Sequence, residues 1–226
     1  MKLRLYIYSA LLLLITAGIS SCKKDNYEAP KSTLSGRVVF QGQSVGVRSN
    51  GVQLQIWQHG YAFFTPITVY VDQTGRFSAL LFDGDYKVTR VAGAPWLAQT
   101  DSVSVKVSGD TQVDVPVSPY SIVSNATYQR SGTTITANIT VQKLQTTSQI
   151  EAVRLYLFRT TLVDQNNSDA TINVDGVTVT SGQAFTTNVT IPASLTGADA
   201  VYVRVGVKTV GINELAYSAP TKIQLK

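Results

Sequence analysis

Residues 200–208 carry the sequence Ala-Val-Tyr-Val-Arg-Val-Gly-Val-Lys, and this stretch decides the fold class. Its four valines, at positions 201, 203, 205 and 207, alternate with Tyr202, Arg204 and Lys208. Successive side chains of a β-strand point to opposite faces of the sheet, so the valines share one face and the larger polar residues share the other. The stretch therefore predicts a β-strand with one apolar face and one polar face.

Similar short segments, rich in β-branched and aromatic residues, follow one another through most of the chain. The first group occupies residues 34–40, 52–57, 68–71, 76–82, 86–91, 102–107 and 111–117. The second group occupies residues 122–130, 134–142, 152–159, 176–180, 184–191, 200–209 and 216–225. Short strands at a spacing of about 8–12 residues are typical of β-sandwiches, and no segment beyond the N-terminal leader has a helical period. We therefore expect an all-β fold with two consecutive β-sandwich domains.

Turn residues separate these segments and also mark the boundary between the domains. Gly75 closes the turn 72–75 and can adopt a positive φ. Ser108-Gly109-Asp110 is typical of a tight hairpin. Pro119 follows a strand and lacks the amide hydrogen that continued pairing requires. The sequence thus predicts a first sandwich over residues 33–119 and a second over residues 120–226.

The N-terminus has the layout of an export signal. Lys2 and Arg4 precede a mainly apolar run, and small residues separate this run from Cys22, the single cysteine. The run is shorter than the roughly 20 apolar residues that a membrane-spanning helix needs, so residues 1–21 are interpreted as a signal peptide. Small residues directly before a cysteine resemble the bacterial lipobox, which implies diacylation of Cys22 and a lipidated tether over residues 22–32. The alternative is an ordinary secretory signal in which the cysteine stands by coincidence.

The charge balance and the cysteine count exclude some functions. The 226-residue chain has 19 Lys and Arg against 14 Asp and Glu, and removal of Lys2 and Arg4 with the leader lowers the formal net charge from +5 to +3. Nucleic-acid-binding proteins concentrate basic residues in one patch or along one element, and this sequence has no such block. Acylation of Cys22 would leave no thiol for a disulfide, a metal or nucleophilic catalysis. We therefore expect no nucleic-acid partner.

The sequence also lacks the residue combinations of most enzyme sites. His59 is the single histidine, which excludes multi-histidine metal sites and a cysteine–histidine dyad, and no Gly-x-Ser-x-Gly elbow accompanies it. A carboxylate glycosidase is a remote alternative, with the candidates Asp72, Asp83, Asp85, Asp101, Glu151, Asp164 and Asp169. The oxygen-rich segment 164–169 lacks the glycine and glutamate of a calcium loop and is interpreted as a flexible loop. We expect no catalytic residue, no metal and no cofactor.

Aromatic residues are the better candidates for binding. In the segment 52–57 the alternation places Trp57 with the glutamines, away from the core, and Tyr61 follows in the same region. Trp96 interrupts the strand pattern between two segments. Tryptophan and tyrosine combine an apolar face with a polar edge, which suits sugar rings and protein interfaces. Trp57, Tyr61 and Trp96 are therefore predicted ligand or partner contacts, and the alternative is that such aromatics cover the ends of the sandwich or the contact between domains.

Three motifs of the first domain resemble the carboxypeptidase regulatory-like, or transthyretin-like, sandwich. They are Leu34-x-Gly36-x-Val38, Val71-Asp72-x-x-Gly75-x-Phe77 and Phe82-x-Gly84-x-Tyr86-x-Val88. The end of the second domain, Tyr217-Ser218-Ala219-Pro220, is similar to the last strand of fibronectin type III and other immunoglobulin-like domains. The resemblance implies this pair of sandwich types.

Together with Cys22-x-x-Asp25-Asn26-Tyr27-x-x-Pro30 and Val117-x-Pro119-Tyr120, these motifs resemble an uncharacterised family of Bacteroidetes outer-membrane lipoproteins. That resemblance covers the whole chain and implies a surface-exposed protein from glycan-utilisation loci of the starch-utilisation type. Our leading hypothesis is a non-catalytic accessory protein of a polysaccharide uptake system, which contacts glycan or an outer-membrane transporter complex. The second hypothesis is a structural spacer that braces a membrane complex.

Overall fold

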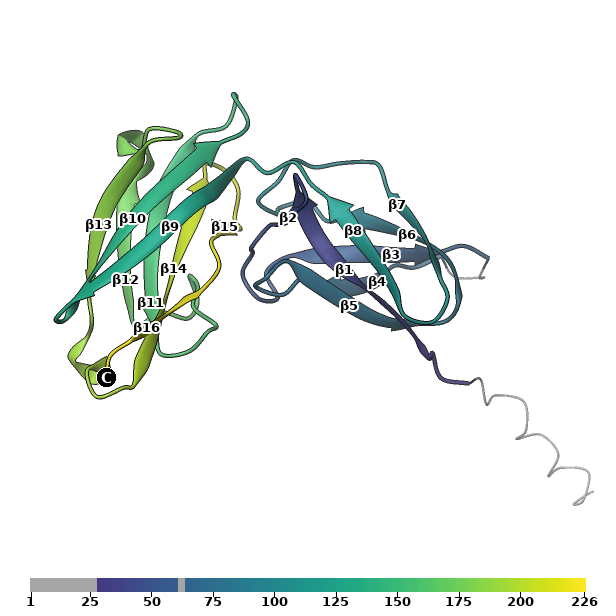
Figure 1. Ribbon diagram of the computed structural model, residues 1–226. Helices are drawn as coiled ribbons and strands as arrows, with labels where there is room; N and C mark the ends of the chain where they lie inside the picture. Colours follow the sequence, from purple (N-terminus) through teal and green to yellow (C-terminus); the bar gives the residue numbers. More distant parts are fainter. Residues whose placement is uncertain (1–27, 61–63) are drawn as a thin grey trace, which may run out of the picture. The chain divides into compact units, whose positions relative to one another are not determined.

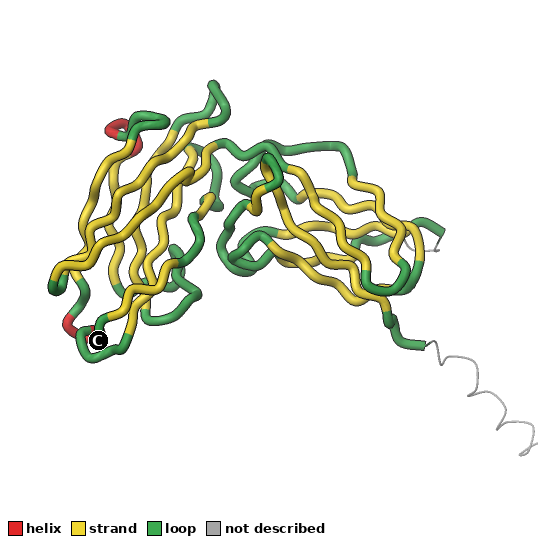
Figure 2. Tube along the Cα trace, viewed as in Figure 1, coloured by secondary structure: helices red, strands yellow, loops and turns green. Residues whose placement is uncertain are grey.

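The structure is a computed structural model, and it describes residues 28–60 and 64–226. The signal peptide, Cys22 and Tyr61 lie outside the described residues, so the predictions made for them stay predictions. Strands dominate the described chain, and its helical segments are short 3₁₀ turns (Figure 2). Within the described ranges, no helix has the length and apolar character needed to cross a membrane.

The first sandwich consists of two four-stranded sheets (Figure 1). One sheet has the order β2-β1-β5, and β8 pairs in parallel with β1; the other has the order β4-β3-β6-β7. The strands are β1 (Ser32–Phe40), β2 (Gln43–Ser44), β3 (Gln53–Gln58), β4 (Ile67–Tyr70), β5 (Arg76–Leu81), β6 (Gly84–Arg90), β7 (Val103–Val107) and β8 (Thr111–Pro116). Alternate residues of each sheet form the core between them: Leu54 and Ile56 of β3 are fully buried, as is Val38 of β1.

The segment 108–110 does not form the predicted hairpin. Gly109 has a positive φ of 62°, as a tight turn requires, but β7 pairs with β6 whereas β8 pairs with β1 in the opposite sheet. The turn therefore carries the chain from one sheet to the other. Both arrangements point the valines of β7 and β8 into the core, so alternation alone does not distinguish them.

The second sandwich pairs a three-stranded sheet with a five-stranded one. The first has the order β13-β10-β9, and the second has the order β12-β11-β14-β15 with β16 also paired to β14. The strands are β9 (Ser121–Ser131), β10 (Thr134–Lys143), β11 (Ile150–Phe158), β12 (Ala170–Asp175), β13 (Ala184–Thr190), β14 (Ala200–Thr209), β15 (Ala216–Tyr217) and β16 (Thr221–Gln224). The four valines of β14 are at most 1% exposed and lie in one core cluster, which confirms the predicted strand.

Two predicted strands of this domain are wrong in detail. The segment 176–180 contains the 3₁₀ turn η2 (Gly176–Thr178), and the strand lies just before it as β12. Asp175 caps this turn by accepting a hydrogen bond from the Val177 amide, so the backbone leaves the sheet there. The predicted strand 216–225 is divided into β15 and β16, and Pro220, in the gap, has no amide hydrogen to donate to β14.

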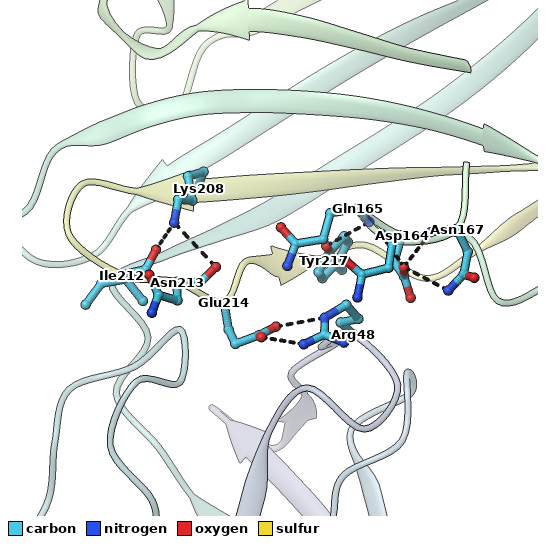
Figure 3. Close-up of polar contacts among 10 residues, drawn as sticks. Arg48, Asp164, Gln165, Asn167, Lys208, Ile212, Asn213, Glu214 and Tyr217 are labelled. Carbon is cyan, nitrogen blue, oxygen red and sulfur yellow. Dashed lines mark hydrogen bonds and ion pairs between the residues drawn. The ribbon is translucent and has the colours of Figure 1, made fainter. Parts of the chain in front are cut away.

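Residues 31–226 form one compact unit, in which the two sandwiches contact each other directly. Arg204 of β14 is fully buried, and its guanidinium donates to Val47 O at 3.0 Å and Gln73 O at 2.7 Å in the first sandwich. Arg48 forms a two-point ion pair with Glu214, with N–O distances of 2.6 and 3.2 Å (Figure 3). The Tyr217 amide also donates to Gly46 O at 2.9 Å.

Burial around this contact changes the titration of three tyrosines. It raises the pKa of Tyr217, Tyr156 and Tyr128, because their ionised forms are poorly solvated there. Above about pH 10 the unfolded chain releases these three protons while the folded chain keeps them, so stability falls as pH rises. Arg204, whose pKa burial lowers to about 10, has the opposite sign but is a single group.

We therefore expect the free energy of unfolding to decrease from about pH 10 upward. Urea unfolding at a series of pH values measures this slope, and tyrosinate absorbance of the folded protein gives the number of tyrosines that resist ionisation. Tyr217→Phe should make the slope shallower than that of the wild type. Equal slopes for this variant and the wild type would contradict the assignment to the buried group.

Candidate functional site

The outer face of the β4-β3-β6-β7 sheet carries an aromatic and polar surface. Trp57 lies on the outward side of β3, because the alternating residues Leu54 and Ile56 are buried in the core. This confirms the side of the strand that the alternation predicts for it. Directly opposite on β6 is Lys87, which in turn faces Ser104 of β7. One row of the sheet thus presents an indole, an ammonium group and a hydroxyl.

Three aromatic rings lie together at the end of β3. Phe64 packs on Trp57 with ring centroids 4.9 Å apart and an angle of 35° between the planes. His59 packs on Phe64 with centroids 4.6 Å apart and an angle of 30°. Phe64 is 52% exposed, so this aromatic cluster of Trp57, His59 and Phe64 reaches the surface. Rings in such a group offer flat apolar area with little conformational freedom to lose on binding.

Hydrogen bonds fix the orientation of the indole. Trp57 Nε1 donates to Thr89 Oγ1 at 2.9 Å, and Thr89 Oγ1 donates to Gln55 O at 3.4 Å. Thr89 is the direct partner of Gln55 across β3 and β6, so the strand register places these groups. The polar edge of Trp57 is therefore satisfied within the sheet, and the remaining exposed ring surface is available for stacking.

A cavity of about 810 Å³ lies beside the aromatic cluster. Its lining contains His59, Asp85, Lys87, Ser104 and Lys106. Among the described residues, the ammonium groups of Lys87 and Lys106 have no hydrogen-bond or ion-pair partner, although Lys106 faces Asp85 across the strands. A cavity with hydroxyl, carboxylate and ammonium groups beside aromatic rings matches the polar edges and apolar faces of sugars.

Trp96 lies elsewhere, in the core of the first sandwich. Its side chain is 2% exposed, and its backbone forms an isolated β-bridge with Pro119. A ring that is buried in this way presents no exposed surface to a ligand or partner. Trp96 is therefore not brought together with Trp57.

Most of the predicted carboxylates are engaged in structural contacts. Asp72 accepts from the amides of Thr74 and Arg76, and Asp101 pairs with Arg90 at 3.1 Å. Asp83 accepts from Ser32 and Gly109, which lowers its pKa. Asp169 pairs with Arg159, which likewise lowers the pKa of the Asp169 carboxyl.

The segment 164–169 is an ordered turn around a buried carboxylate. Asp164 is 2% exposed and accepts from the backbone amides of Asn166 and Asn167. Figure 3 shows Asn167 beside this carboxylate. In the part of the chain that the structure describes, no group of three or more His, Cys, Asp or Glu residues is placed to hold a metal ion. The segment interpreted from its sequence as a flexible loop is instead held by hydrogen bonds to the Asp164 carboxylate.

Sequence reasoning found Trp57 and its outward direction but missed the cationic side of the surface. The strand register places Lys87 of β6 directly opposite Trp57 and places Lys106 one strand further away, on β7, opposite Asp85. Both lysines are distant from Trp57 in sequence. Phe64 had a signal in its closeness to His59, but its stacking on Trp57 depends on how the chain returns to β4.

Comparisons with known proteins place this chain in a family. The model described as "Protein of unknown function (DUF3823) N-terminal domain" matches residues 32–118, and the model "Domain of unknown function (DUF3823_C)" matches residues 121–222. None of the curated proteins compared matches the chain.

Solved structures agree with these matches. The crystal structure of a DUF3823 family protein from Bacteroides ovatus is 37% identical with a TM-score of 0.83, and one from Parabacteroides merdae is 34% identical with a TM-score of 0.80; each comparison covers 87% of this chain and 100% of the other. A protein from Bacteroides uniformis, described as a candidate carbohydrate-binding protein, has 21% identity and a TM-score of 0.70 with the same coverage, and shares the fold. The chain therefore belongs to the DUF3823 family.

Proposed function

We propose that this protein is a non-catalytic, lipid-anchored surface protein that binds glycan as an accessory component of a polysaccharide uptake system. The observation that carries the proposal is the aromatic cluster of Trp57, His59 and Phe64 beside a polar cavity. The description of the Bacteroides uniformis neighbour as a candidate carbohydrate-binding protein supports the same class of ligand. Acylation at Cys22 would hold the binding surface at the outer membrane.

The chemistry of the surface favours binding over hydrolysis. A glycosidase needs two carboxyl groups about 5–10 Å apart that are free to exchange protons with the substrate. The cavity is lined by one carboxylate, Asp85, together with two lysines. Stacking on Trp57 and Phe64 with hydrogen bonds from Lys87 and Lys106 requires no such pair.

Replacing Trp57 by alanine should weaken binding of a retained polysaccharide by at least about tenfold, because central aromatic side chains dominate the free energy of such contacts. Affinity electrophoresis first identifies the ligand. Residues 23–226 are run through gels that each contain one soluble polysaccharide, and the polymer that retards the protein is used for the comparison. Leu162→Ala is the matched control, because Leu162 is 48% exposed and belongs to the second sandwich. Equal retention of both variants would contradict binding at this surface.

A spacer is the second candidate function, and the contact between the sandwiches favours it. Arg204 and the Arg48–Glu214 pair hold the two domains together through partly or fully buried groups. A spacer requires that connection but no ligand surface. Failure of every polysaccharide to retain the wild-type protein would leave the spacer as the better account.

A further inference from the structure

A second cavity, of about 920 Å³, lies on the opposite sheet of the first sandwich. It covers the outer face of β8, β1 and β5, and Tyr70 of β4, the edge strand of the other sheet, also belongs to its lining. Its lining residues are Ser35, Gly36, Arg37, Tyr70, Asp72, Arg76, Phe77, Ser78, Gln112, Val113 and Asp114. We name this surface the arginine groove.

Two short side chains, Ser35 and Ser78, lie on the floor of the arginine groove. Ser35 of β1 faces Ser78 of β5 on one side and Gln112 of β8 on the other. The next pair of outward-facing residues in β1 and β5 has longer side chains, Arg37 and Arg76. A pair of serines beside longer side chains makes a depression in an otherwise flat sheet, with serine hydroxyls at its base.

The two arginines of the groove differ in their ion pairing. Arg37 and Arg76 are direct partners across β1 and β5, so their guanidinium groups share one face of the sheet. Asp114 of β8 binds Arg37 at two points, at 2.6 and 3.0 Å, which raises the pKa of Arg37. Among the described residues, the Arg76 guanidinium has no hydrogen-bond or ion-pair partner.

The second carboxylate at the groove, Asp72, forms no ion pair with the Arg76 guanidinium among the described residues. Asp72 accepts from the Thr74 amide and hydroxyl at 2.7 Å and from the Arg76 backbone amide at 2.9 Å. These contacts hold the Asp72 carboxylate to its own turn. Like charges directly opposite on neighbouring strands repel, so an anion beside Arg76 would be favourable for the sheet as well as for the ligand.

We propose that the arginine groove binds the acidic group of a saccharide, a carboxylate or a sulfate ester, through Arg76. A guanidinium presents a planar pair of N–H donors that matches either anion. The ring of Tyr70, which is 48% exposed at the rim, provides an apolar face for the sugar, and Ser35, Ser78 and Gln112 provide hydrogen bonds. This inference rests on the proposed function, and it assigns an acidic glycan to a surface separate from Trp57.

The test compares charged and neutral polymers on residues 23–226, the protein without its leader and Cys22. Isothermal titration with polygalacturonate and with its methyl-esterified form isolates the carboxylate, and dextran sulfate against dextran isolates the sulfate. Arg76→Gln should weaken binding of the charged polymer by at least about tenfold. Arg154→Gln, which removes a partly exposed arginine of the second sandwich, should leave that affinity unchanged.

A second variant keeps the charge and fills the groove. Ser78→Tyr places a large ring on the floor beside Ser35, so it should abolish binding of the charged polymer while Arg76 remains in place. Thermal melts of both variants confirm that the sandwich is folded. If both variants bind the charged polymer as tightly as the wild type does, the arginine groove is not its binding site.

The outcomes separate this inference from the proposed function. Loss of charged-polymer binding in Arg76→Gln and not in Trp57→Ala supports an independent acidic-sugar site. Binding of neutral polymer alone, lost in Trp57→Ala, overturns the groove and leaves the proposed function in place. Retention of no polymer at all would overturn both.

Discussion

Replacing Arg204 by alanine is expected to lower the free energy of unfolding by about 3–5 kcal/mol, one of the two largest effects expected in this chain. The guanidinium is fully buried and donates to Val47 O and Gln73 O of the first sandwich. It also donates to Ser218 O at 2.8 Å and Val163 O at 3.5 Å of the second. Removal of the side chain leaves these carbonyl oxygens without their donor and leaves a cavity between the domains.

The buried charge of Arg204 is stabilised by dipoles and a ring rather than by an ion pair. No described carboxylate forms an ion pair with it, whereas its guanidinium carbon lies 4.4 Å from the centre of the Tyr217 ring. Burial lowers its pKa to about 10, so the group is still protonated at neutral pH. The carbonyl oxygens and the ring therefore offset a large cost of desolvation. When the guanidinium is removed, water cannot take over its hydrogen bonds at this buried position.

The two tryptophans of the chain make this prediction specific, because Trp57 and Trp96 both belong to the first sandwich. In Arg204→Ala, circular dichroism should show two thermal transitions where the wild type shows one, and tryptophan fluorescence should follow the transition of the first sandwich alone. Arg204→Lys keeps the charge but loses the fork and should be intermediate. Arg154→Ala, on the neighbouring strand, should cost less than about 0.5 kcal/mol. A single unchanged transition in Arg204→Ala would contradict the role of this residue.

Arg204 also shows what alternation can and cannot predict. The pattern of residues 200–208 places Arg204 on the face opposite the valines, and the structure agrees. Alternation identifies a face of a strand but not what covers it, and here the loops of the first sandwich cover the guanidinium. The burial of an arginine depends on a contact between residues 157 positions apart in sequence, which no local pattern contains.

The surface around Trp57 likewise combines features that alternation predicts with features that depend on contacts between strands. The outward direction of Trp57 follows from six residues of sequence, and the structure confirms it. The position of Lys87 opposite Trp57 and the opposed arginines of the groove require the register between strands, which the sequence does not state. Trp96 has no alternating neighbours, so nothing in its segment distinguishes a buried ring from an exposed one.

Replacing Gly36 by alanine is the second large effect expected. Gly36 lies in β1 between Phe77 of β5 and Val113 of β8. A Cβ atom added at this position would lie 1.8 Å from Val113 O and 2.8 Å from Val113 C, inside the contact distance of any two atoms. Because both clashing atoms are backbone, no side-chain rotation relieves them, and β8 must separate from β1. We expect a loss of about 3 kcal/mol or more.

The control for this substitution is Gly197→Ala, because no atom lies within 4 Å of a Cβ at Gly197 and its φ lies outside the positive range. That change should be neutral or slightly stabilising, since alanine restricts the unfolded chain. Tryptophan fluorescence during urea unfolding measures the first sandwich directly, and the midpoint for Gly36→Ala should fall well below that of the wild type. An unchanged midpoint would mean that β8 does not approach β1 as closely as the parallel pairing requires. The glycine of the motif Leu34-x-Gly36-x-Val38 would then have a role other than close packing against the Val113 backbone.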